Sequence, residues 1–127
     1  MRQNVVGMLA LLLVPACATA PRSHDTVPST PATGSVAWSL EEAFDRIPGV
    51  LKEAGWDVTE VNFRTGVIQG NRSEGGYPEW VGVTLLPKVE GGSDFRISVR
   101  SSRGGREGSQ AAKVVRVAIL AAAEGGS

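Results

Sequence analysis

The chain holds few side chains capable of nucleophilic or acid–base chemistry. Its 127 residues include one cysteine, Cys17, and one histidine, His24. A single cysteine forbids an internal disulfide, and a single histidine excludes most zinc sites and the Ser/His/Asp and Cys/His catalytic groups. His24 stands in a stretch rich in Pro, Ser and Thr, where a solvated linker residue is the simplest interpretation. We therefore expect a protein that is not an enzyme and that holds no metal or cofactor.

Carboxylates leave one catalytic alternative open. Paired Asp or Glu residues can cleave a glycan, and aromatic rings stack on sugars. Three glutamates and three aromatic residues are candidates for such a site: Glu60, Glu74, Glu79, Trp56, Tyr77 and Trp80. Exposed glutamates and tryptophans used for packing explain the same residues more simply. An envelope hydrolase is thus the third hypothesis, after two binding functions.

The densest charge bias is a run of arginines near the C-terminal end, at Arg96, Arg100, Arg103 and Arg106. Arg96 and Arg100 should share the solvent face of one strand, because side chains four apart in a strand point the same way. Guanidinium groups bind phosphate through two parallel hydrogen bonds, so these residues are candidate contacts for an anion, such as a lipopolysaccharide phosphate, or for an acidic partner. The alternative is a solvated sheet face balanced by local glutamates.

The overall charge balance excludes one class of partner. The 13 basic and 13 acidic residues cancel to a net charge of zero. A neutral chain provides no global field that would recruit nucleic acid. We expect no nucleic-acid partner, and the sequence leaves the oligomeric state open.

The N-terminal segment has the pattern of a secretory leader. Arg2 precedes an apolar stretch from Val5 to Val14, and small residues follow at 16 to 18. This ten-residue stretch, broken only by Gly7, forms roughly 15 Å of helix, about half of the ~30 Å hydrocarbon core of a membrane. The segment therefore predicts export rather than a membrane-spanning anchor.

The peptide Leu13-Val14-Pro15-Ala16-Cys17 resembles the lipobox of bacterial lipoproteins. The resemblance implies cleavage between Ala16 and Cys17, a diacylglycerol on the Cys17 thiol and acylation, for example with palmitate, of the new amino terminus. Several acyl chains hold a protein stably where one holds it marginally. The resemblance further implies that a residue other than aspartate after the cysteine, here Ala18, directs the protein to the outer membrane facing the periplasm. The alternative is ordinary secretion, which would leave a secreted or periplasmic protein.

Composition divides the chain into four parts. Residues 1–16 are the expected signal peptide, residues 17–35 the lipidated cysteine and a flexible tether, residues 36–124 one small domain and residues 125–127 a tail. Proline, serine and threonine dominate the tether, which has too few apolar side chains to form a buried core. The remaining 89 or so residues suffice for one small core.

Periodicity predicts the elements of the domain. Ser39 and Glu42 form a capping box, so a helix should begin at Leu40, and Pro48 should kink or break it. Strands are expected over 56–63, 67–71, 80–86 and 95–101, and a second helix, capped by Ser109, over 110–123, with Val114 among its inward-facing residues. This order predicts an α+β fold: a three- to four-stranded antiparallel sheet with two helices on one face. Periodicity does not decide whether 56–71 forms one bent strand or two.

The phrases Gly55-Trp56-Asp57-Val58 and Thr65 to Ile68 resemble those of uncharacterised small bacterial envelope lipoproteins. The order of elements is similar to the helix-grip domains of the accessory lipoprotein in the outer-membrane β-barrel assembly machine. The resemblance implies a lipid-anchored, non-catalytic envelope protein with a protein-interaction or accessory role, and it supplies no active-site residue. A binder of small amphiphiles or glycans, in the groove between sheet and helices, is the alternative.

Overall fold

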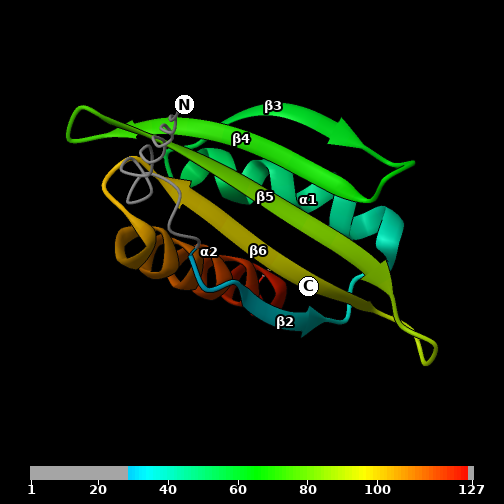
Figure 1. Ribbon diagram of the computed structural model, residues 1–127. Coiled ribbons are helices and arrows are strands. Elements are labelled where there is room, and N and C mark those ends of the chain that lie inside the picture. The colour runs from blue at the N-terminus through cyan, green and yellow to red at the C-terminus, as the bar shows by residue number, and fades with distance from the viewer. Residues whose placement is uncertain (1–28, 126–127) are drawn as a thin grey trace, which may run out of the picture.

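The computed structural model describes residues 29–125. The leader, Cys17 and most of the expected tether lie outside the described residues. The elements follow one another as β2 (Ala32–Val36), α1 (Leu40–Glu53), β3 (Asp57–Asn62), β4 (Val67–Glu74), β5 (Tyr77–Pro87), β6 (Ser93–Ser101) and α2 (Gly105–Gly125) (Figure 1).

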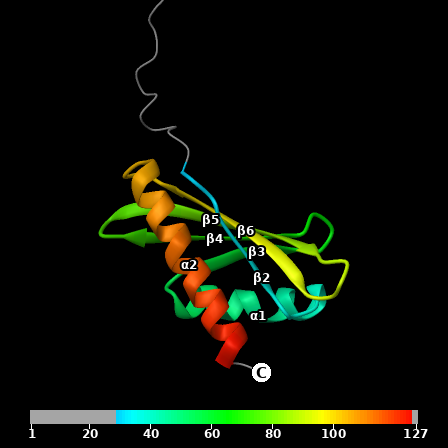
Figure 2. The ribbon, with the colours of Figure 1, turned by 90° about the horizontal axis from the view of Figure 1, so that it is seen from below.

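All neighbouring strands pair antiparallel in one sheet of order β2-β6-β5-β4-β3. Both helices pack on the same face of this sheet, α2 mainly against β6 and β2 and α1 against β3 (Figure 2). The α+β class and the two helices on one face are thereby confirmed. The sheet has five strands among the described residues, and the segment 56–71 forms two of them.

Strand β2 corrects the domain boundary, because its residues 32–35 were assigned to the tether. The strand pairs with β6 from Ala32 opposite Ile97 to Val36 opposite Ser93. Its hydrogen bonds come from the backbone, so a composition typical of a linker does not prevent pairing. A side-chain Cβ on Gly34 would lie 2.5 Å from the ring of Phe95, so glycine lets the ring pack directly on the β2 backbone.

Helix α1 begins where the capping box placed it. The Ser39 side chain accepts a hydrogen bond from the Glu42 backbone N–H at 3.1 Å. The expected break at Pro48 is wrong, because the helix continues through this residue. Phe44 and Ile47 before the proline and Leu51 after it are buried in the core. This packing on both sides of Pro48 offsets the backbone hydrogen bond that proline removes.

Helix α2 begins at Gly105, five residues before the expected start, and also includes Gly125 of the expected tail. Ser109 does not cap it: its hydroxyl donates to the Gly105 carbonyl at 2.8 Å and accepts from the Thr30 N–H at 2.7 Å. Val114, expected to face inward, is 59% exposed. A Cβ on Gly108 would lie 2.5 Å from the Val99 carbonyl oxygen, so glycine permits the close approach of α2 to β6.

The hairpin between β4 and β5 is longer than periodicity indicated. Gly75 and Gly76 have φ values of 59° and 85°, and Glu74 pairs with Tyr77 across them. Two consecutive positive φ values are typical of the tight two-residue hairpin turn. The longer strands bring Arg72 and Glu79 opposite each other.

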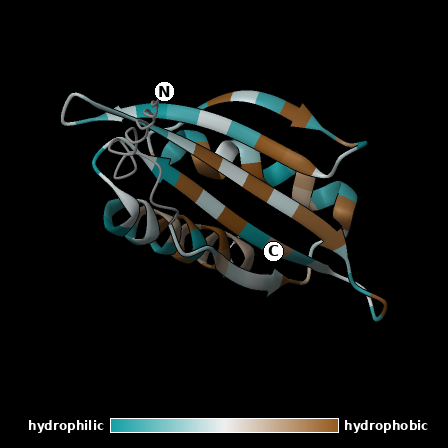
Figure 3. Cartoon of the chain, viewed as in Figure 1, coloured by the Kyte–Doolittle hydropathy of each residue, from teal (hydrophilic) through white to brown (hydrophobic). Residues whose placement is uncertain are grey.

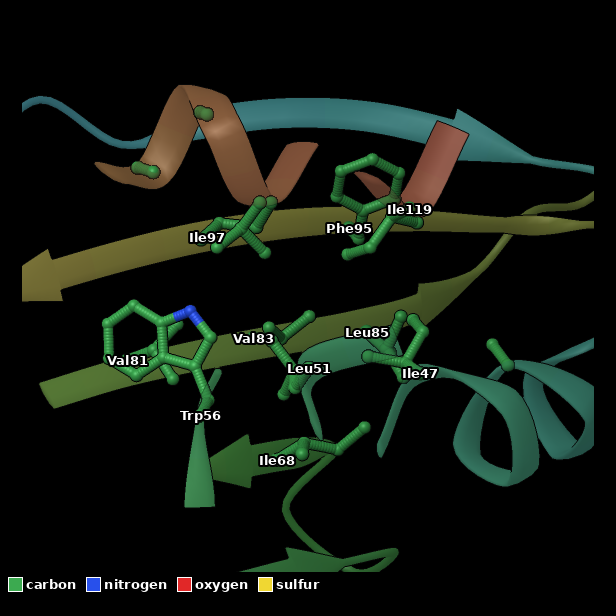
Figure 4. Packing of buried hydrophobic residues seen from close by; sticks show 14 of the residues in the cluster. Ile47, Leu51, Trp56, Ile68, Val81, Val83, Leu85, Phe95, Ile97 and Ile119 are labelled. Carbon is green, nitrogen blue, oxygen red and sulfur yellow. The ribbon is translucent and has the colours of Figure 1, made fainter. Parts of the chain in front are cut away.

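The core lies between the inner face of the sheet and the two helices (Figure 4). Alternate residues of β5 and β6 point into it, which appears as alternating bands of hydropathy along both strands (Figure 3). Fully buried side chains include Ile47, Leu51, Val83, Ile97 and Ile119. None of the helices within residues 29–125 is long and apolar enough to cross a membrane.

Candidate binding face of the sheet

The face of the sheet opposite the helices is uncovered within the described residues (Figure 2). Strict alternation along β6 buries every second residue and exposes Asp94, Arg96, Ser98 and Arg100. Neighbouring β5 exposes Trp80, Thr84 and Leu86 on the same face. We call this surface the outer face. Arg96 and Arg100 share it, as strand periodicity predicted.

A hollow of about 880 Å³ lies on the outer face. Gly82 of β5 pairs with Ser98 of β6 on one side and with Gln69 of β4 on the other. A Cβ built on Gly82 meets no atom within 4 Å, so this position opens to solvent. Gly82 has no side chain and the neighbouring Ser98 has a short one, so the middle of the outer face forms a depression.

Trp80 and Arg100 form one wall of the hollow. They face each other across β5 and β6, and the Arg100 guanidinium carbon lies 4.6 Å from the centroid of the indole ring. This is a cation–π contact, and 40% of Trp80 stays exposed. On the other side of Trp80, Asn71 of β4 adds a side-chain amide to the lining.

Arg96 lies two outward positions before Arg100 along β6, opposite Thr84 on β5 and Thr33 on β2. Strand geometry separates the backbones of Arg96 and Arg100 by about 13 Å. Among residues 29–125, neither arginine has a carboxylate within ion-pair distance. Neither arginine forms an ion pair within this part of the chain, although the same face also carries exposed carboxylates at Asp94 on β6 and at Asp57 and Glu60 on β3.

The other two arginines of the run lie elsewhere. Arg103 follows β6 and turns toward the helix side, where it approaches Glu79 and Tyr77. Arg106 is exposed in the first turn of α2. The structure thus brings Arg96 and Arg100 together on one face and does not bring Arg103 or Arg106 to it.

Glu79 forms a buried charged cluster on the inner face, next to Trp80 in sequence but on the opposite side of β5. Its side chain is fully buried. One carboxylate oxygen accepts from Arg72 Nε at 2.9 Å, and the other accepts from Ser101 Oγ at 2.8 Å and Arg103 Nη2 at 3.4 Å. The Arg72 guanidinium also covers the buried ring of Trp56, 4.2 Å from its centroid.

The pKa of Glu79 follows from these contacts. Burial would raise the pKa, but the hydrogen bonds from Ser101, Arg72 and Arg103 outweigh it and hold the pKa below its usual value of 4.5. The carboxylate is therefore ionised at neutral pH, and both of its oxygens are already engaged. A group with these properties serves to join β4, β5, β6 and the loop that carries Arg103.

Four of the six residues considered for glycan cleavage contact Arg72 or Arg103, and the other two, Glu60 and Trp80, lie apart from this cluster. Glu74 is exposed and reaches Arg72 at 4.0 Å, while Glu60 accepts a hydrogen bond from Asn62 on β3. Trp56 is buried and its indole N–H has no partner among the described residues, whereas Trp80 lies on the outer face. The side chains of residues 29–125 also place no three His, Cys, Asp or Glu residues together as a metal site.

Two features of this region escaped the sequence analysis. A glutamate among the β-forming residues of β5 is a sign of a buried, paired charge, but its partners come from β4, β6 and the following loop. A glycine inside a strand is a sign of a close approach or an opening, and Gly82 is of the second kind.

Comparison of the chain with protein-family models and with curated proteins finds no match to either.

Proposed function

We propose that the protein is a lipid-anchored, non-catalytic binding protein of the bacterial cell envelope, held in the outer membrane on the periplasmic side through Cys17. The leader and the lipobox-like peptide before Cys17 support the anchor. The binding role rests on the described domain. Its role in the envelope is that of an accessory or interaction domain.

The uncovered outer face is the main support for the proposed binding function. A sheet with helices on one side only leaves the other side free for a partner, and here that side carries a hollow, an exposed tryptophan and two arginines that form no ion pair with residues 29–125. Exposed Trp and Arg side chains are enriched in binding sites. The only strongly buried carboxylate of this region, Glu79, already has its hydrogen bonds satisfied within the fold.

The partner is either another envelope protein or a glycan or small amphiphile. The sequence placed the second kind of ligand between the sheet and the helices. Core side chains such as Ile97, Phe95 and Ile119 occupy that layer (Figure 4), and the large hollow lies on the opposite face. The outer face is therefore the surface to test for both kinds of partner.

The anchor is tested by metabolic labelling. Cells that express the full chain are labelled with a palmitate analogue, and native Cys17 is compared with Cys17→Ser. We expect label and membrane association in the native chain only. Equal recovery of both chains, unlabelled, in the culture fluid or the soluble periplasm would overturn the anchor.

The binding face is tested by site-specific photocrosslinking in the same cells. A photoreactive residue replaces exposed Thr84 on the outer face or exposed Lys113 on α2, which serves as the matched control. We expect a discrete adduct, identified by mass spectrometry, from position 84 and none from position 113. No adduct from position 84, or the same adducts from both positions, would argue against a binding role for the outer face.

A further inference from the structure

We infer that the hollow over Gly82 binds a phosphorylated sugar, with Arg100 on the phosphate and Trp80 against the sugar ring. The inference deepens the proposed function, because it rests on the outer face being the binding surface. It does not depend on the anchor, since every residue it uses belongs to the described domain.

Arg100 is prepared for an anionic group. Its flat guanidinium lies over the Trp80 ring, 4.6 Å from the ring centroid. Stacking uses the face of the guanidinium, while its N–H donors lie in the plane and stay free for the two parallel hydrogen bonds that phosphate accepts. The stacked position also restricts the side chain before the ligand arrives, which lowers the entropy lost on binding.

The charge of Arg100 is available to an anion. No described carboxylate pairs with Arg100 or with Arg96, which lies two outward positions away on β6, with Ser98 between them. Arg100 lines the hollow, whereas Arg96 is not among its lining residues. We therefore assign the direct phosphate contact to Arg100 and a longer-range attraction to Arg96.

The rest of the hollow suits a sugar. Trp80 is 40% exposed, and the C–H groups on one side of a sugar ring pack on the electron-rich face of an aromatic ring. Side chains able to donate and accept hydrogen bonds line the same hollow: Asn71, Gln69, Ser98 and Thr59. Amides and hydroxyls are the groups that pair with sugar hydroxyls.

The lining of the hollow combines the exposed ring of Trp80 with the amides of Gln69 and Asn71, the hydroxyl of Ser98 and the guanidinium of Arg100. Gly82 provides the depth, because any larger residue at this position would fill the space where the ligand lies.

The test uses the full chain in detergent and its indole N–H resonances in a ¹⁵N–¹H NMR spectrum. The chain has three tryptophans, so three indole signals are expected, and Trp80→Phe identifies the one from Trp80. N-acetylglucosamine 1-phosphate, N-acetylglucosamine and inorganic phosphate are titrated separately. We expect the sugar phosphate to shift the Trp80 signal, with at least about tenfold tighter binding than either fragment.

Three variants separate the contributions. Arg100→Gln should weaken binding by about tenfold to a hundredfold, because a charge-assisted contact is lost, and Arg96→Gln by about twofold to threefold. Gly82→Val should abolish binding by filling the hollow while keeping both arginines. Arg64→Gln, at an exposed arginine in the turn between β3 and β4, is the matched control and should bind as the native chain does.

Several outcomes would overturn the inference. They are an unmoved Trp80 signal with the sugar phosphate, equal binding of inorganic phosphate alone, or native affinity in Gly82→Val. Unchanged signals from buried Trp38 and Trp56 show that each variant is folded. Adducts from position 84 without sugar-phosphate binding would refute this ligand and leave the proposed function standing, whereas binding without lipid labelling would refute the anchor alone.

Discussion

The two faces of the sheet differ in whether their charged side chains have partners within the fold. On the inner face Glu79 is fully buried and three side chains donate hydrogen bonds to it. On the outer face Arg96 and Arg100 are exposed and have no carboxylate partner among the described residues. An ionised group buried in the core must be paired with other groups of the fold, whereas an exposed ionised group can remain unpaired and available to a ligand.

The largest contrast is expected between neighbouring residues of β6 that face opposite sides. Ile97→Ala removes a fully buried side chain and leaves a cavity, so we expect a loss of about 3 kcal/mol in the free energy of unfolding. Ser98→Ala alters the exposed side and should change this free energy by less than about 0.5 kcal/mol. Chemical denaturation of both variants measures the difference, and equal losses would contradict the division between the two faces.

The second contrast concerns the buried charge. Glu79→Gln leaves two arginines without their carboxylate, and we expect a loss of about 2 kcal/mol in the free energy of unfolding, below the usual range because Arg72 and Arg103 are partly exposed, at 18% and 37%. Glu74→Gln is the matched control: Glu74 is 53% exposed and 4.0 Å from Arg72, so its loss should stay below about 0.5 kcal/mol. Similar stabilities for the two variants would show that the buried cluster does not hold the sheet together.

The stability that Glu79 contributes should depend on pH. Since the pKa of Glu79 is lowered on folding, its contribution to stability is complete above the unfolded pKa and is lost as the pH falls toward the folded pKa. The difference in the free energy of unfolding between the native chain and Glu79→Gln should therefore be constant above about pH 5 and shrink in acid. A difference that grows in acid would mean that burial, which raises the pKa, prevails over the hydrogen bonds.

The smallest effect is expected at Gly82. Valine favours strand backbone, and the added side chain meets no atom within 4 Å of its Cβ, so Gly82→Val should raise the free energy of unfolding by up to about 1 kcal/mol. Thermal unfolding measures this change. A stabilised variant that no longer binds the sugar phosphate would show that the glycine is present for the hollow, whereas a destabilised variant would show that it is needed for the sheet.

Local signals predicted much of the fold. The capping box fixed the start of α1, and the alternation in 95–101 identified the strand and its outward arginines, because these patterns depend on residues close in sequence. The turn at Gly75 and Gly76 was missed, although two adjacent glycines are a local signal of a hairpin. Strand β2 was missed for another reason, since its pairing with β6 depends on residues about sixty positions away.

The candidate site was predictable only in part. The sequence pointed to Arg96 and Arg100, but grouped them with Arg103, which the buried charge of Glu79 attracts to the other side of the sheet. The hollow requires Gly82, Ser98 and Gln69 to lie in one row across three strands, and that register follows from the complete pairing of the sheet. Side chains that meet through tertiary pairing leave no spacing pattern in the sequence.

The way the chain enters the domain has a mechanical consequence. The Ser29 hydroxyl donates to the Val99 carbonyl and the Thr30 N–H donates to the Ser109 hydroxyl, just before β2 begins. Tension along the preceding chain would reach these two hydrogen bonds first and the five residue pairs of β2 and β6 afterwards. Because Ser29 also lines the hollow, tension on the chain before this residue would displace part of the hollow's rim before β2 separates from β6.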